Sequence, residues 1–520
     1  MSAAPSRTDR PDVPFEWSIG SRPITLHELD AALGRRLRVS LSPETAERIR
    51  RSNAQVQAIA AGSEAAYGIN TGFGHLCTKR IAPDEVAALQ RNLILSHAVG
   101  VGEDAPRDIV RWMMLLKAAS LSHGVSGVSP AAVQCLLDLL NHDLLPTIPT
   151  QGSLGASGDL APLAHMVLPM IGEGRLRVDG TELPAAEALR RAGVQTVTLG
   201  PKDGLALING TQFMAAYAAH VAVRAHRLVK HCDIVATMSL EGLMGSVRPF
   251  DGRLHAARPH PGAIATASNV RRLMAGSEIL PSHANCGRVQ DPYSLRCVPQ
   301  VHGASREALH HASGIIETEI NSVTDNPLIF DDGSVVSGGL FHGQHLALAL
   351  DYLAIALAEL GSISERRIYL LLSGAADLPT LLMRDTGINS GFMLPQYTAA
   401  ALVSENKGLC MPSSVDSIPT SLGQEDHVSM GARAAVKCRT VLENTETVLA
   451  IEQMCAAQAL DYRAPLLAGM GPRSAHQAIR RVIDHAEQDR SFGDDIRASL
   501  AILRGGKILT AVESAVGLLE

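Results

Sequence analysis

The chain has 520 residues and a formal net charge of −6, and only 3% of its residues are aromatic. It is long enough to bury a large core, and a modest negative charge without a basic stripe interleaved with aromatic residues argues against nucleic-acid binding. Its eight cysteines are scattered without a Cys-x-x-Cys pair, which is typical of free thiols in a reducing cytoplasm rather than of a disulfide framework.

The start of the chain is polar and proline-bearing and has no apolar signal-peptide core, which predicts a disordered tail over residues 1–20. Residues 21–520 contain neither a low-complexity linker nor an internal repeat. We therefore interpret them as a single unit, with an N-terminal part over about 21–205 and a bundle of long helices over about 206–520.

Helical periodicity predominates along the chain. In order, we predict short helices between 25 and 57, a glycine-rich loop over 67–74, helices over 84–98 and 109–121, a hairpin over 174–183, long helices over 211–239 and 304–322, a second hairpin over 328–336, long helices over 341–373 and 430–460, and two further helices after Ser474 and Asp494. The fold class is thus all-α, mainly helical with two small β-hairpins, and the long helices form an elongated bundle. The most apolar window, 341–360, contains four ionisable residues, which favours a buried core helix over a membrane span.

The most informative motif is a glycine-rich turn that reads Gly-Ser-Leu-Gly-Ala-Ser-Gly-Asp-Leu-Ala-Pro-Leu-Ala over residues 152–164. Glycine tolerates strained dihedral angles and close backbone approach, so the Gly158 nitrogen can reach the Ala156 carbonyl. If that bond forms and two waters are lost, Ser157 becomes the methylidene of a five-membered ring. Such a ring is an electrophile, which no standard side chain provides.

A second Ala-Ser-Gly, Ala312-Ser313-Gly314, serves as an internal comparison. It lies between residues that predict helix, where the backbone amides are engaged and cannot cyclise. Other motifs fail on their spacing. Asp159 stands where a Gly-x-Ser-x-Gly elbow needs its last glycine, and His342 and His345 come without the further ligands of a zinc site, so we expect no metal.

The turn resembles the signature of the aromatic amino acid lyase family, whose members include ammonia-lyases and aminomutases. Four further blocks match the family in the same order, so the resemblance spans about residues 60–460: Tyr67-Gly-Ile-Asn-Thr-Gly-Phe-Gly74, Asn209-Gly-Thr-Gln212, Gln290-Asp-Pro-Tyr-Ser-Leu-Arg296 and Gln424-Glu-Asp-His-Val-Ser-Met430. The resemblance implies a cytoplasmic, largely helical homotetramer with active sites shared between subunits. It implies no external cofactor, because the 4-methylidene-imidazol-5-one ring forms from Ala156, Ser157 and Gly158.

The resemblance also implies roles for residues around the ring. Tyr67 is the expected base for the β-proton of the substrate, and Arg296 the expected bidentate partner of its carboxylate. Tyr293 resembles a residue on the electrophile side. Asp159 and Phe341 resemble residues that favour cyclisation, although Asp159 is equally well placed to be a helix N-cap.

Substrate contacts are expected from Asn209, from Gln290 in the same polar cluster, and from a pair that is similar to the histidine-specific members of the family. In that pair, His97 and Glu425 can satisfy the ring donor and acceptor of an imidazole. The resemblance therefore implies an amino acid substrate, no nucleic-acid or membrane partner, and elimination of ammonia from L-histidine to give trans-urocanate. Leu340 departs from the family, which usually has Asn before Phe341.

Two other functions stay open on this sequence. One is an ammonia-lyase or 2,3-aminomutase for tyrosine or phenylalanine, which the departure at Leu340 allows. The other is a non-catalytic helical scaffold, which the presence of Ser157, Tyr67 and Arg296 argues against.

The two tripeptides predict different outcomes for one substitution. Ser157→Ala should lower turnover by several orders of magnitude, because the residue acts through chemistry, whereas Ser313→Ala should leave turnover nearly unchanged. Steady-state assays of both variants decide the point. Equal losses in the two variants would mean that the wrong tripeptide has been assigned.

Overall fold

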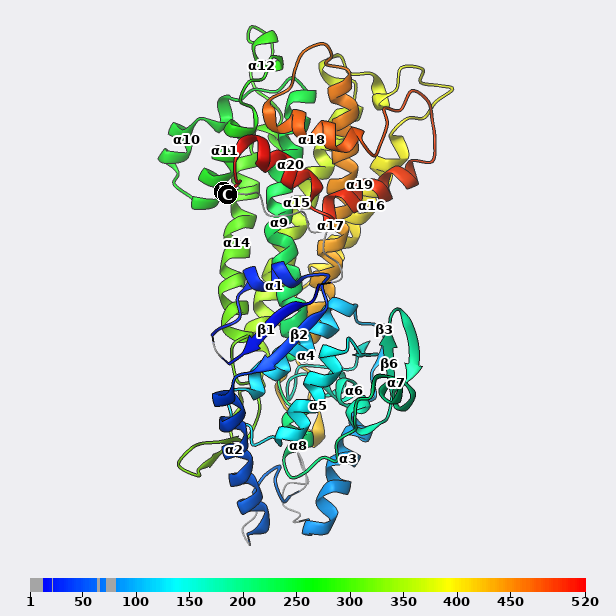
Figure 1. The fold of residues 1–520 in the computed structure, drawn as a ribbon. Helices are drawn as coiled ribbons and strands as arrows, with labels where there is room; N and C mark the ends of the chain where they lie inside the picture. The colour runs from blue at the N-terminus through cyan, green and yellow to red at the C-terminus, as the bar shows by residue number, and fades with distance from the viewer. Residues whose placement is uncertain (1–12, 21, 63–65, 72–80) are drawn as a thin grey trace.

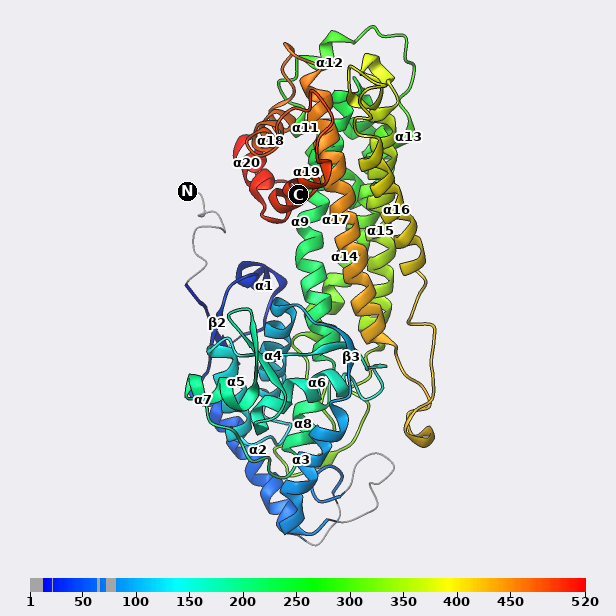
Figure 2. The same cartoon turned by 90° about the vertical axis from the view of Figure 1, so that its right-hand side faces the viewer.

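Two regions follow one another along an elongated molecule, seen in a computed structural model that describes residues 13–20, 22–62, 66–71 and 81–520. The N-terminal part forms a lower region of short helices and small strands, and long helices rise from it as a bundle (Figures 1 and 2). The C-terminal helices lie around the upper end of this bundle. The predicted all-α class is confirmed.

The lower region is built mainly by the elements from β1 to α8. Its helices and strands are β1 (Phe15–Ile19), α1 (Leu26–Ala32), β2 (Leu37–Leu41), α2 (Pro43–Ala61), α3 (Val86–His97), β3 (Val101–Asp104), α4 (Arg107–Leu121), α5 (Pro130–Asn141), β4 (Leu145–Pro146), β5 (Pro149–Gln151), α6 (Leu160–Val167), β6 (Arg175–Val178), β7 (Thr181–Pro184), α7 (Ala185–Ala192) and α8 (Asp203–Ile208). β6 and β7 form the first predicted hairpin, and β4 pairs with β6 at its edge. β3 pairs antiparallel with β5.

Most of the remaining elements build the bundle and its upper end, whereas the hairpin over 328–336 lies against α2. They are α9 (Gln212–Gly242), α10 (Gly252–Ala257), α11 (Pro261–Leu273), α12 (Ile279–Ser282), α13 (Tyr293–Arg296), α14 (Val298–Glu319), β8 (Leu328–Ile329), β9 (Val335–Val336), α15 (Gln344–Leu372), α16 (Met393–Leu409), α17 (Gly431–Asp461), α18 (Met470–Arg480), α19 (Phe492–Arg504) and α20 (Lys507–Val516). The long helices correspond to α9, α14, α15 and α17, and the second hairpin to β8–β9. The C-terminal region has three helices rather than two, because Gly506 adopts a positive φ of 71° and separates α19 from α20.

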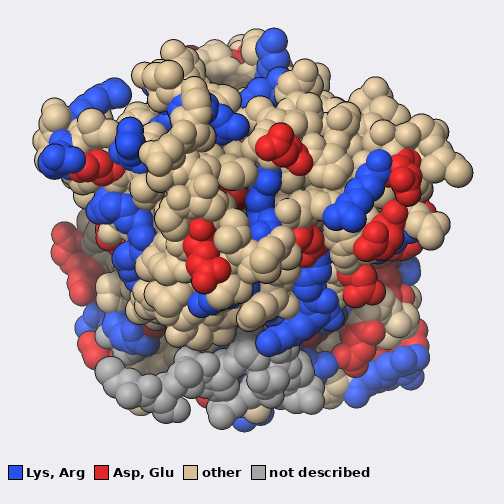
Figure 3. Space-filling view, turned by 90° about the horizontal axis from the view of Figure 1, so that it is seen from above, with Lys and Arg blue, Asp and Glu red and all other residues tan. Residues whose placement is uncertain are grey.

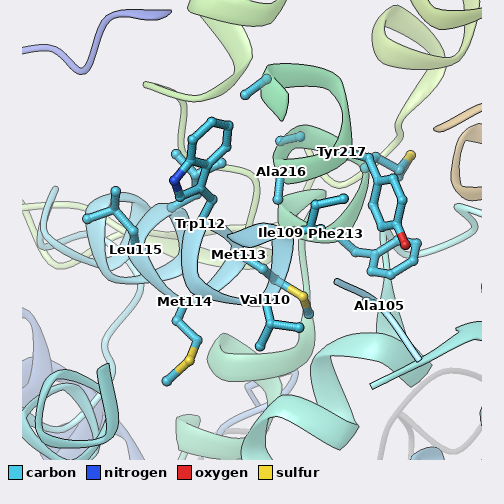
Figure 4. Packing of buried hydrophobic residues seen from close by; sticks show 14 of the residues in the cluster. Ala105, Ile109, Val110, Trp112, Met113, Met114, Leu115, Phe213, Ala216 and Tyr217 are labelled. Atoms are coloured by element: carbon cyan, nitrogen blue, oxygen red, sulfur yellow. The ribbon is translucent and has the colours of Figure 1, made fainter. Parts of the chain in front are cut away.

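Helix α9 is the axis of the molecule because it is apolar and buried around almost its whole circumference. Trp112 and Met113 of α4 lie in the same core cluster as Phe213 and Tyr217 of α9 (Figure 4). Aromatic and thioether side chains bury large areas and fill irregular gaps. This packing fixes the lower region against the N-terminal half of α9.

Helix α15 is long and apolar enough to cross a membrane by length and composition, but 67% of its most apolar 18-residue window is buried inside the structure. It packs between α14 and α17, as expected for a core helix. Its outer face nevertheless exposes large apolar side chains, namely Leu348, Tyr352, Ile355 and Tyr369.

Charged side chains are intermixed on the face of the molecule seen from above, with Lys and Arg beside Asp and Glu (Figure 3). Exposed ion pairs of this kind contribute little to stability, since water screens them.

The predicted tail over 1–20 is wrong at its C-terminal end. Residues 1–12 lie outside the described part of the chain, but Phe15–Ile19 form strand β1, which pairs in parallel with β2 from Phe15↔Leu37 to Ile19↔Leu41. Trp17 and Ile19 are buried against the large core cluster. The segment is ordered because its alternating apolar residues find a sheet partner that lies about 20 residues further along the chain.

This docking predicts a measurable stability difference. Trp17→Ala should destabilise the protein by about 3–5 kcal/mol, because it removes a large buried side chain. Val13→Ala, at a position that is 55% exposed, is the matched control and should leave the thermal midpoint nearly unchanged. Equal midpoints for both variants would show that β1 is not docked in solution.

Candidate active site

The glycine-rich turn lies between β5 and α6 and is held from several sides. The Ser153 hydroxyl accepts a hydrogen bond from the Gly155 amide at 3.1 Å. From the segment before α17, the Met430 amide donates to the Leu154 carbonyl at 2.8 Å, and the Ser429 hydroxyl donates to the Gly155 carbonyl at 3.2 Å. The turn is therefore clamped by residues nearly 300 positions away in the chain.

Gly158 lies in direct backbone contact with Gly210, which joins α8 to α9. The two residues form an isolated parallel bridge, and the Asp159 amide donates to the Gly210 carbonyl at 2.7 Å. Gly158 has a φ of 73°, and a Cβ placed on it would lie 2.1 Å from the Gly210 oxygen. No residue but glycine fits there without displacing the Gly210 backbone.

Asp159 is buried and bridges the turn to α9. Its carboxylate accepts hydrogen bonds from the Met214 amide at 2.9 Å and from the Ser153 hydroxyl at 3.2 Å. Asp159 is the N-cap residue of α6, as the alternative interpretation expects, but its side chain makes no capping hydrogen bond to that helix. Burial raises the pKa of Asp159 to about 7 against these hydrogen bonds.

Ser157 is bonded on both sides to predicted site residues. Its hydroxyl donates to Glu425 Oε1 at 2.8 Å, and its carbonyl accepts from Asn209 Nδ2 at 3.3 Å. The second Glu425 oxygen accepts from the Thr420 hydroxyl at 2.6 Å. Asn209 Oδ1 is buried and has no hydrogen-bond partner among the described residues, so this acceptor is available to a ligand.

His97 ends helix α3, and its Nδ1 lies 3.0 Å from the Ser96 hydroxyl. Burial lowers the pKa of His97, while a hydrogen bond with the Leu93 backbone and the charge of Glu425 act in the opposite direction. The charge of Glu425 thus acts on the His97 imidazole, and a role of the two side chains in binding substrate stays a prediction.

Tyr67 and Phe341 lie on loops that approach the same region. Tyr67 is partly buried against the main core cluster, and the adjacent Gly68 lies against Leu205 of α8. Residues 72–74 of the predicted glycine-rich loop lie outside the described chain. Phe341 is partly buried, and two residues later Gly343 packs against Met214. Leu340 is 53% exposed.

The three remaining predicted residues lie elsewhere in the chain. Gln290 is exposed, Tyr293 is 70% exposed, and the Arg296 guanidinium stacks 4.6 Å from the centre of the Tyr293 ring. Arg296 Nε is buried and has no hydrogen-bond partner within the part of the chain that the structure describes. Helix α13, which carries Tyr293 and Arg296, is at the opposite end of the bundle from α6 and α8 (Figure 2).

The length of helix α9 gives the size of this separation. The Met214 amide, near its start, binds Asp159. Beyond its end, the Ser246 amide binds the Asp291 carboxylate at 2.6 Å. The helix has 31 residues, and a rise of about 1.5 Å per residue gives about 45 Å. Gln290, Tyr293 and Arg296 therefore cannot reach a substrate held at Ser157 of the same chain.

Comparisons with known proteins identify the family of this chain. The family model for aromatic amino acid lyases matches residues 24–481. The chain belongs to the aromatic amino acid lyase family. It is 52% identical over 485 residues to the histidine ammonia-lyase of Gloeobacter violaceus, covering 93% of this chain and 94% of that protein.

Solved structures agree with this assignment. Histidine ammonia-lyase from Trypanosoma cruzi superposes with a TM-score of 0.89 at 40% identity and covers 96% of each chain. Tyrosine aminomutase from Streptomyces globisporus superposes with a TM-score of 0.92 at 34% identity, covering 98% of this chain and all of the other.

Sequence reasoning missed the residues that support the site from behind. Thr420 orients Glu425, and Ser153 bonds to both Gly155 and Asp159. Neither has a distinctive local pattern. Lys117 could have been found, since it is the one charged residue in the apolar run from Trp112 to Leu121.

The two glycines of the Ala-Ser-Gly copies provide a matched test of the turn geometry. Gly158→Ala should abolish lyase activity, because its Cβ would collide with the Gly210 carbonyl. Gly314→Ala, in helix α14 with no atom within 4 Å of the added Cβ, should keep full activity and stabilise the helix by about 0.5–1 kcal/mol. An active Gly158→Ala enzyme would contradict the assigned close approach.

Proposed function

We propose that this chain is a histidine ammonia-lyase, which removes ammonia from L-histidine to give trans-urocanate. The observation that carries the proposal is the contact between the reactive turn and Glu425, one of the two residues expected to bind an imidazole. Ser157 bonds directly to Glu425, and Glu425 lies within electrostatic range of His97. The relative from Gloeobacter violaceus, similar over 93% of the chain, bears the same activity in its name.

The turn is suited to form its own electrophile. Bonding of the Gly158 nitrogen to the Ala156 carbonyl carbon, with loss of one water there and a second from the Ser157 side chain, yields the 4-methylidene-imidazol-5-one ring. The cradle around Gly158 fits this group, because the Gly210 backbone leaves no room for a side chain. When formed, the ring supplies an electrophile that turns the substrate amine into a leaving group.

The residues around the turn then have separate tasks. Asn209 donates to the Ser157 carbonyl oxygen, where it stabilises negative charge as an oxyanion-hole donor does. Tyr67 takes the β-proton of the substrate as general base. Phe341 and Asp159 help to shape and polarise the turn for cyclisation.

An imidazole substrate suits the polar pair opposite the turn. His97 and Glu425 can pair with its ring donor and acceptor. A phenyl ring offers neither, so each of the two side chains forgoes a hydrogen bond with the substrate, at a cost of about 1–3 kcal/mol for a buried group left unsatisfied. The second candidate is a tyrosine or phenylalanine aminomutase or lyase. It is favoured by Leu340 and by the 34% identity to a tyrosine aminomutase structure.

The active site is completed by another copy of the chain in a cytoplasmic homotetramer. Two observations support this part of the proposal. First, α13 lies about 45 Å from the turn of its own chain, yet it presents Tyr293 and Arg296 at an exposed end of the bundle. Second, the outer face of α15 exposes large apolar side chains, which in soluble proteins mark interaction sites. In the tetramer, Arg296 grips the substrate carboxylate, and Tyr293 and Gln290 line the electrophile side.

Substrate preference tests the function directly. The kcat/KM for histidine should exceed that for phenylalanine by about 10⁴-fold or more, because a site built for hydrogen bonds rejects an analogue that lacks them. Parallel assays of urocanate, cinnamate and coumarate formation measure it. A preference for tyrosine or phenylalanine, or a β-amino acid product, would establish the second candidate instead.

Shared active sites predict complementation between inactive variants. Ser157→Ala and Arg296→Ala should each lose nearly all activity alone. Hetero-tetramers refolded or co-expressed from both should regain a fraction of it, because some sites then receive an intact turn and an intact arginine. Mixing Ser157→Ala with Gly158→Ala, which damage the same turn, is the control and should restore nothing. The absence of recovery in the first mixture would show that sites are not shared in this way.

A further inference from the structure

A buried lysine lies directly behind the reactive turn. Lys117 belongs to α4, is 1% exposed, and stands among the core residues that join α4 to α9. Figure 4 shows the preceding turns of this helix, with Trp112, Met113 and Met114 in the core. An amine in such surroundings is costly unless it is bonded.

The Lys117 amine bonds to the backbone that carries Asn209. Its Nζ donates to the Ala206 carbonyl at 3.2 Å and to the Asn209 carbonyl at 2.7 Å. These groups lie at the C-terminal end of α8, where helix carbonyls have no intrahelical partner and a positive charge is favourable. The amine thus fixes the end of α8.

From that point the chain leads straight to the turn. The Asn209 side chain donates to the Ser157 carbonyl, and the next carbonyl, that of Gly210, accepts from the Asp159 amide. Lys117 therefore anchors the segment that makes both contacts with the turn, through the Asn209 side chain and the Gly210 carbonyl. A shift of the α8 end would move the donor to Ser157 and the cradle of Gly158 together.

Lys117 also belongs to a buried group of charges. Lys202 pairs with Asp325 at 2.8 Å, with both side chains almost fully buried. Burial lowers the pKa of Lys117 to about 7, with Asp325 and Asp159 opposing the effect and Lys202 adding to it. At Asp159, where burial raises the pKa, the charge of Lys117 acts to lower it, as do the amides of Met214 and Phe213 and the hydroxyl of Ser153.

We propose that Lys117 is a positioning residue of the reactive turn, which fixes Asn209 against the Ser157 carbonyl and stabilises the Asp159 carboxylate. This inference rests on the proposed lyase function. Lys117 does not touch the substrate, and it acts through Asn209 and Asp159.

The charge of Lys117 has a definite effect on pH dependence. The carboxylate form of Asp159 is present above its pKa and is lost as the pH falls through about 7. Removing the positive charge of Lys117 raises that pKa further. If Asp159 acts as the carboxylate, the acid limb of the pH–activity profile, where activity falls as the pH is lowered, must then move to higher pH.

Three variants separate hydrogen bonding from charge. Lys117→Met removes both, Lys117→Gln keeps N–H donors without the charge, and Lys117→Arg keeps donors and charge. We expect Lys117→Met to lower kcat by about 10²-fold, as loss of an oxyanion-hole donor does, with a smaller change in KM. Lys117→Gln should recover part of kcat but keep an acid limb shifted to higher pH, and Lys117→Arg should hold the limb near the wild-type position.

Lys437→Met is the matched control. Lys437 of α17 is also a buried lysine, and its amine pairs with the Asp351 carboxylate of α15 at 2.6 Å. Its replacement should leave the pH profile unshifted. An unshifted acid limb in both Lys117→Met and Lys117→Gln, or an equal shift in Lys437→Met, would overturn the inference. Should Lys117→Met not assemble, as judged by thermal midpoint and light scattering, Lys117→Gln against Lys117→Arg gives the same decision.

Failure of this inference is distinguishable from failure of the proposed function. Histidine turnover by the wild-type enzyme tests the function without any Lys117 variant. If the wild-type enzyme turns over histidine and the Lys117 variants keep the wild-type pH profile, only the positioning role of Lys117 is contradicted.

Discussion

The contact between Gly158 and Gly210 is the constraint on which the rest of the structure depends. Gly158 and Gly210 come from separate segments, and their backbones approach so closely that a Cβ on Gly158 would collide with the Gly210 carbonyl. The proposed cyclisation joins the Gly158 nitrogen to the Ala156 carbonyl carbon two residues back, and a relaxed turn keeps these two atoms apart. The neighbouring contacts, from Ser429, Met430 and Asp159, keep the turn in that conformation.

The length of α9 imposes the second constraint. This helix of 31 residues separates the turn at one end from the α13 region at the other. Because it is packed into the core, it cannot bend enough to bring the two regions together. Ser157 and Arg296 are therefore held far apart within one chain. Under the proposed function, the same rigidity makes activity depend on association, with the apolar outer face of α15 as a surface for it.

Much of this arrangement could be predicted from the sequence. Long helices and both hairpins follow from periodicity and turn residues, and the decoy tripeptide at 312–314 lies in α14 as its flanks indicate. The strand β1 could not be predicted, because its order depends on pairing with β2 and on burial of Trp17. Within the site, the motifs named Ser157, Asn209 and Glu425, which the fold brings together. The separation of Arg296 from Ser157 within one chain depends on helix lengths in three dimensions. Thr420 acts through a contact that no local pattern encodes, and the apolar run around Lys117 marks that lysine as unusual without indicating its contact with Asn209.

The central claim is that the turn at 156–158, and not its copy at 312–314, becomes an electrophile. Tandem mass spectrometry of tryptic peptides tests it most directly, since cleavage after Lys117 and Arg175 isolates residues 118–175, and cleavage after Arg306 and Arg366 isolates residues 307–366. The account predicts that the first peptide is lighter by two waters, with the loss confined to Ala156, Ser157 and Gly158, and that the second has its full encoded mass. An unmodified 118–175 peptide from enzyme that turns over its substrate would contradict the account.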